Sequence, residues 1–195
     1  MSDSAFGENT HFREETASLR DALRTKMDTA AERIARRDSV SRAVGTDDRT
    51  ILDRLEQLGF TGESVKVIDL LPLVHVAWSD GRVQHSERAA ILAVVEARGI
   101  SPSSEACLLI ETLLERRPSE TFLAESLALV RDLARRSGRD NSEVVDLCAT
   151  VAEASGRIFG LGNPVSAAER ELIEKIADVL GAPAQERFRA LFRAT

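Results

Sequence analysis

Apolar residues recur every three or four positions through nearly the whole chain. No stretch alternates between apolar and polar residues as a half-buried β-strand would. Glycine, proline and helix-capping residues divide the periodic stretches into eight or nine segments. The sequence therefore predicts an all-α fold. The chain has 195 residues, 43% hydrophobic and 30% charged, which is enough to bury one core without a metal or a disulfide.

The first periodic segment is long and highly charged. After about ten residues of flexible tail, a helix is expected from Phe12 to Val44, where Gly45 ends it. Its apolar residues form a narrow stripe, closer to a coiled-coil seam than to the broad face of a core helix. The stripe consists of Leu19, Leu23, Met27, Ala30 and Ile34.

Two interpretations of this stripe remain open. Either the helix lies across the rest of the protein, or it pairs with a protein partner or a second copy of the chain. We therefore divide the chain into a tail with its long helix, residues 1–45, and a helical domain, residues 46–195.

Capping and breaking residues mark the next helices. Asp48 is expected to cap a helix that ends at Leu58, just before Gly59. A further helix is expected over residues 63–79, with Pro72 causing a kink or a broken first turn.

A motif occurs twice in the chain. The first copy is Asp80-Gly81-Arg82-Val83, then Glu87, Ile91 and Gly99; the second is Ser155-Gly156-Arg157-Ile158, then Glu169, Ile173 and Gly181. In both copies isoleucine follows glutamate by four positions and glycine follows it by twelve. Each copy indicates a helix, a glycine turn and an amphipathic helix. One such hairpin cannot bury its apolar stripe alone, so we expect two hairpins packed about a pseudo-twofold axis.

These two motifs resemble the signatures of a known family. The segment from Leu71 to Val83, followed by Glu87 and Ile91, is similar to the first signature of the TerB-like tellurite-resistance domain. Residues 151–162, followed by 166–169, are similar to the second. The resemblance covers about residues 48–181 and implies an all-helical cytosolic module. Relatives are associated with tellurite and other stress responses and occur beside metal-linked and chaperone-related proteins.

The first turn allows two interpretations. Asp80, Gly81 and Glu87 match the latter half of an EF-hand loop, but the early ligand positions fall on Val76 and Trp78, which have no side-chain oxygen. A full EF-hand is excluded, and a weak site for a divalent cation, calcium or magnesium, remains as the alternative. In the other interpretation, the Asp80 turn is structural and Glu87 caps its helix, as Glu169 does in the Ser166 capping box.

Three further residues are candidates for partner binding. Trp78 beside the turn either packs into the core or docks a partner. Phe159 and Leu161 lie in a glycine-rich loop and either fold inward or form an apolar docking surface.

Composition and motifs exclude several classes of function. A net charge of -6 argues against nucleic acid as the main partner, and no segment is long and apolar enough to span a membrane. No catalytic constellation is evident, and Cys107 and Cys148 are expected to be small buried thiols, as in a cytoplasmic protein. The sequence favours a non-enzymatic protein-interaction or scaffold module, with a metal-responsive protein as the alternative.

Overall fold

The computed structural model describes residues 4–156 and 165–192, and side chains within residues 16–154 and 165–192. These residues contain helices and no strand, which confirms the all-α prediction. The elements are α1 (Ser4–Val44), α2 (Arg49–Gln57), the 3₁₀ helix η1 (Ser64–Leu70), α3 (Leu71–Ala77), α4 (His85–Ala97), α5 (Glu105–Glu115), α6 (Glu120–Ser137), α7 (Ser142–Gly156), α8 (Ala167–Leu180) and α9 (Ala182–Phe192).

The chain begins its first helix earlier than expected. α1 starts at Ser4, eight residues before Phe12, because residues 4–11 contain no proline to stop a helix already formed beyond them. The next boundary follows the prediction. The Asp48 side chain accepts hydrogen bonds from the backbone N–H groups of Thr50 and Ile51, at 2.9 and 3.2 Å.

Pro72 breaks the expected helix over residues 63–79 into two elements. The 3₁₀ helix η1 ends at Leu70, and Pro72 is the second residue of α3, where its missing N–H costs no intrahelical hydrogen bond. The break lets the apolar residues of η1 and of α3 face different neighbours.

α3 is the centre of the core. It packs against η1, α4, α5, α6, α7 and α8, so that a helix of seven residues is covered on nearly every side. All its residues except His75 are buried, and Leu73, Val74, Val76 and Ala77 are fully inaccessible to solvent. The other helices of the body therefore assemble around one short apolar element.

The two predicted hairpins correspond to α3–α4 and α7–α8. α7 packs against α3, α4 and α8, so the two hairpins contact each other directly. The pseudo-twofold relation between them stays a prediction.

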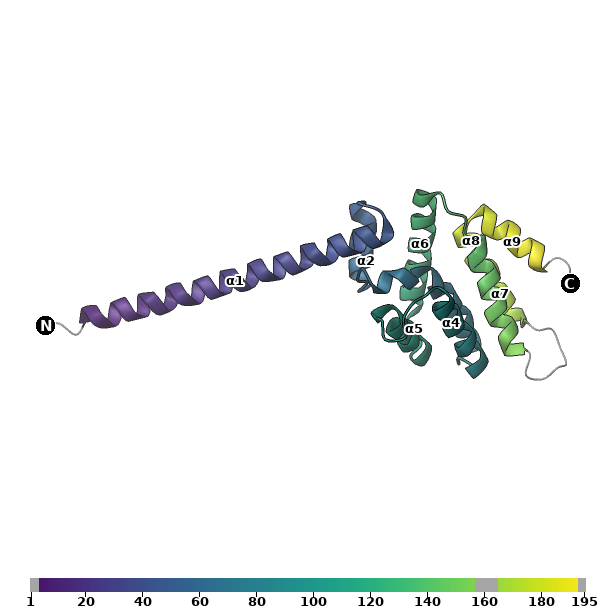
Figure 1. Ribbon diagram of the computed structural model, residues 1–195, viewed down its shortest axis with the longest axis horizontal. Helices are drawn as coiled ribbons and strands as arrows, with labels where there is room; N and C mark the ends of the chain where they lie inside the picture. The colour runs from purple at the N-terminus through teal and green to yellow at the C-terminus, as the bar shows by residue number, and fades with distance from the viewer. Residues whose placement is uncertain (1–3, 157–164, 193–195) are drawn as a thin grey trace.

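α1 extends away from the helical body formed by the other elements, and only its C-terminal end is attached (Figure 1). Val40 is 1% exposed and belongs to the core, whereas the side chains from Ala17 to Arg36 are exposed. Gly62 lies so close to α1 that a Cβ atom there would be 2.8 Å from the carbonyl carbon and oxygen of Ser39. The absence of a side chain at residue 62 thus permits the attachment.

Polar contacts secure the base of α1 to α2. The Arg37 guanidinium lies 2.7 Å from the Asp53 carboxylate, and the Arg36 guanidinium donates a hydrogen bond of 3.1 Å to the carbonyl of Gly59. Because both arginines are in the last turns of α1, these contacts fix its direction relative to α2.

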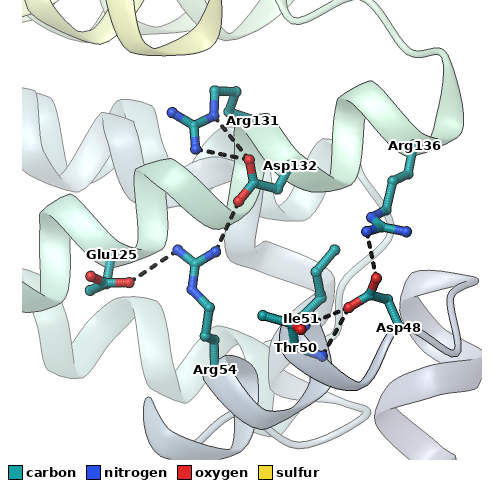
Figure 2. A network of polar contacts seen from close by, with 8 residues as sticks. All are labelled: Asp48, Thr50, Ile51, Arg54, Glu125, Arg131, Asp132 and Arg136. Atoms are coloured by element: carbon teal, nitrogen blue, oxygen red, sulfur yellow. Dashed lines mark hydrogen bonds and ion pairs between the residues drawn. The ribbon is translucent and has the colours of Figure 1, made fainter.

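α2 is in turn tied to α6 by the network in Figure 2. Arg54 of α2 reaches Asp132 and Glu125 of α6 at 2.9 and 3.0 Å. The same face of α6 supplies Arg136, which lies 2.5 Å from Asp48. Burial alone would raise the pKa of Asp132, but hydrogen bonds from Arg54 and Arg131 outweigh it, so this pKa lies below its ordinary value.

We predict that Gly62→Ala loosens the base of α1. The added Cβ would overlap the Ser39 backbone, which cannot move independently of the helix, so the free energy of unfolding should fall by about 1–3 kcal/mol. Urea unfolding measures this loss, and limited proteolysis should cut sooner near Gly45. Lys66→Ala, an exposed change on η1, is the control. Equal stability of both variants would contradict the close approach.

Candidate functional site

The apolar stripe of α1 is solvent-exposed. Its large residues are exposed by 66% (Leu19), 59% (Leu23), 70% (Met27) and 63% (Ile34). Among the described residues, Leu108 at 52% is the only other large hydrophobic side chain this exposed. Single exposed leucines are ordinary on a protein surface, but four large apolar residues in one line indicate a surface that something covers.

The stripe is narrow because of its spacing. At 3.6 residues per turn, the stripe residues from Leu19 to Ile34 fall within roughly 80° around the helix axis. The opposite face carries polar residues such as Thr25 and Glu32, which are also exposed. A surface of this width matches the ridge of another helix better than a globular face.

This exposure excludes one of the two interpretations of the stripe. A helix lying across the protein would bury residues 19–34 against the body, and the structure shows them in solvent. That interpretation is wrong. Pairing with a protein partner or a second copy remains a prediction.

Glu87 is at the third position of α4 and is 1% exposed. Its carboxylate accepts a hydrogen bond of 2.7 Å from the backbone N–H of Gln84, the contact that the capping interpretation predicts. Asp80 is exposed at the turn, where its carboxylate accepts a hydrogen bond of 3.2 Å from the N–H of Arg82. Gly81 has φ of +88°, a conformation that glycine adopts without strain.

Glu169 repeats this arrangement at the start of α8. Its carboxylate accepts from the N–H of Ser166 at 2.6 Å, and its own N–H donates to the Ser166 hydroxyl at 3.2 Å. Both glutamates are buried, Glu87 at 1% and Glu169 at 5% exposure. Each carboxylate therefore caps its helix at a position shielded from solvent.

The two carboxylates are close enough to repel each other. Burial raises the pKa of Glu87, and the negative charges of Asp80 and Glu169 raise it further. The hydrogen bond from Gln84 opposes these effects, and the pKa is about 7. The motif predicted the two caps separately and missed that the charge of Glu169 acts on Glu87. Placing the repeated glutamates about the expected pseudo-twofold axis is the signal that could have suggested it.

The described residues do not form a closed metal site. No group of three or more histidine, cysteine, aspartate or glutamate side chains within them is arranged to hold a metal ion. Calcium takes six to eight oxygen ligands, so a cation at Asp80 and Glu87 would depend on backbone carbonyls and water. His75 is instead near Glu120, with 3.7 Å between its Nε2 and the carboxylate.

The remaining candidates do not join the stripe. Trp78 is partly buried against the core, and its indole N–H donates a hydrogen bond of 2.9 Å to the carbonyl of Leu113. Phe159 and Leu161 lie outside the described residues. Cys107 and Cys148 are buried free thiols, as predicted.

A known family matches this architecture. A family model described as tellurite resistance protein TerB matches residues 68–191, from the end of η1 through most of α9. The chain belongs to the TerB family of all-helical proteins. The matched region begins after α1 and α2, so the exposed stripe lies outside it. The sequence has no match among curated proteins or solved structures. None of the described helices could cross a membrane, because none combines the necessary length with sufficient apolar character.

We predict that Glu87 makes stability depend on pH. In the unfolded chain its pKa is near 4.5, and folding raises it to about 7. The folded protein therefore binds this proton more tightly, so the contribution of Glu87 to the free energy of unfolding is greatest below pH 4.5 and is lost as the pH rises through 7. The difference between the two pKa values corresponds to up to about 3 kcal/mol.

Denaturant unfolding at pH 5 and pH 8 measures this effect. Glu87→Gln keeps an acceptor oxygen for the Gln84 N–H and cannot ionise, so this variant should lose less stability between the two pH values than the native chain. Glu174→Gln, an exposed change on α8, should behave like the native chain. Equal losses in all three proteins would show that Glu87 titrates normally.

Proposed function

We propose that this TerB-family protein is a non-catalytic protein-interaction module and that the stripe of α1 binds a helix of another polypeptide. The observation that carries the proposal is the exposure of four large apolar side chains on one narrow line of one helix. Covering such a line removes apolar surface from water, which is the main driving force of protein association.

The attachment of α1 supports this function. The last turns of the helix are held by several contacts with the body. These are the burial of Val40, the close approach at Gly62, and the polar contacts of Arg36 and Arg37. The side chains from Ala17 to Ala35 are exposed, so the stripe between Leu19 and Ile34 is open to solvent. A helix that is fixed at its C-terminal turns and exposed over the stripe is suited to presenting that stripe to another molecule.

The wider setting of the module is part of the proposal. Membership of the TerB family supports a place in a tellurite-resistance-like stress response. Two buried free cysteines suit a reducing compartment, so we place the protein in the cytoplasm. The sequence offers no catalytic motif, which supports a binding role.

We predict that a photo-crosslinking amino acid at Met27 forms protein adducts in cells. The same amino acid at Thr25, on the opposite face of α1, should form few, because only the stripe is covered. Gel mobility and mass spectrometry measure the adducts and the mass of the attached chain. Equal labelling at Met27 and Thr25 would contradict a role for the stripe.

A second candidate function is a weak response to divalent cations at the Asp80 turn. The observation that favours it is that the negative charge of Asp80 helps to raise the pKa of the buried Glu87, a repulsion that a bound cation would relieve. Calcium or magnesium would then stabilise the turn that precedes α4.

Thermal unfolding in chelator, and then with calcium or magnesium at about 1 mM, tests this candidate. Binding at 100 times the dissociation constant should raise the midpoint by roughly 5–10 °C. Glu87→Gln should abolish the rise, and Glu174→Gln should keep it. Absence of any rise in the native chain would leave Asp80 and Glu87 as turn and cap residues only.

A further inference from the structure

We infer that the helix covering the stripe is α1 of a second copy of this chain, running antiparallel to the first. This inference rests on the proposed function and goes beyond it by naming the partner and its direction. Three features of α1 support it: its charge distribution, the spacing of its stripe, and the position of the body at one end.

Charge is distributed unequally along α1. The half from Ser4 to Asp21 contains four acidic and two basic residues, and the half from Ala22 to Val44 contains three acidic and six basic residues. Parallel pairing would place the basic halves together and the acidic halves together. Antiparallel pairing places each acidic half beside a basic half, and such complementarity sets orientation between paired helices.

The stripe also matches itself in the reverse direction. In an antiparallel pair centred beside Met27, Leu19 faces Ile34 of the other copy and Leu23 faces Ala30. The second contact sets a large side chain against a small one, an arrangement that fills the space between two helices. Each helix thus supplies the complement of its own stripe.

The spacing predicts the form of the pair. Two pairs of stripe residues repeat at a spacing of eleven positions: Leu19 with Ala30, and Leu23 with Ile34. An eleven-residue repeat drifts slightly in the opposite sense to a heptad and gives a nearly straight or weakly right-handed pair. Figure 1 shows α1 as one long, nearly straight helix, a shape compatible with such pairing.

The position of the body favours the same direction. The body is attached at the C-terminal end of α1, where Val40 enters the core (Figure 1). In an antiparallel pair the two bodies lie at opposite ends of the paired helices and do not compete for space. In a parallel pair they would lie side by side within a few residues of the end of the stripe.

Sedimentation equilibrium of the full-length protein tests self-association. The native chain should approach twice its monomer mass of 21.3 kDa as concentration rises. Leu23→Glu should weaken the association at least ten-fold, and Thr25→Glu on the opposite face should leave it nearly unchanged. Circular dichroism of each variant checks that the body remains folded. A native chain that stays monomeric at about 100 μM would overturn the inference.

Disulfide crosslinking of full-length variants that each add one cysteine to α1 tests the direction. The native Cys107 and Cys148 are buried, so they add little background. A mixture of Leu19→Cys and Ile34→Cys should form a mixed dimer, while each alone should form little. Met27→Cys lies at the centre and should crosslink to itself in either orientation, which makes it the positive control. Crosslinking of Leu19→Cys and Ile34→Cys each to itself would show a parallel pair.

These results are separate from the test of the proposed function. If the purified chain is monomeric but the Met27 crosslinker captures a polypeptide of another mass in cells, the stripe is a binding surface and the second copy is not its partner. If neither experiment gives a product, both the inference and the proposed function fail.

Discussion

The burial of α3 is the constraint on which the body depends. A helix of seven residues can be covered on nearly every side only if several longer helices converge on it, each with an apolar face turned inward. This requirement fixes the mutual positions of α4, α5, α6, α7 and α8. It also accounts for the interruption at Pro72, because a continuous helix over residues 63–79 could not turn η1 and α3 toward their separate neighbours.

The same packing creates the electrostatic feature of the protein. Glu87 and Glu169 cap helices that begin on facing hairpins, so the burial that satisfies their backbone partners also brings their charges together. The capping contacts stabilise local structure, while desolvation and repulsion work against the ionised state of Glu87. Glu87 therefore caps α4 at a position where burial makes its ionised form unfavourable near neutral pH.

Much of this could be predicted from the sequence, because the governing signals are local. Helical periodicity gave the all-α class, and Asp48, Pro72 and Glu87 act at the boundaries where capping and breaking rules place them. Features that depend on how helices meet were harder to predict. The direction of α1 and the proximity of Glu87 to Glu169 arise from contacts between distant segments. Nothing in the sequence around Gly62 indicated that the backbone of α1 at Ser39 would pack closely against it.

The attachment of α1 has a mechanical consequence. At 1.5 Å per residue its 41 residues form a rod roughly 60 Å long, held at one end. A tilt of about 5° at the base would displace the far end by about 5 Å, which is one full turn of a facing helix. The position of the free end therefore depends on how firmly the attached end is held. The contacts of Ser39, Val40, Arg36 and Arg37 lie at the attached end, where a small limit on the angle of α1 greatly limits the displacement of the free end.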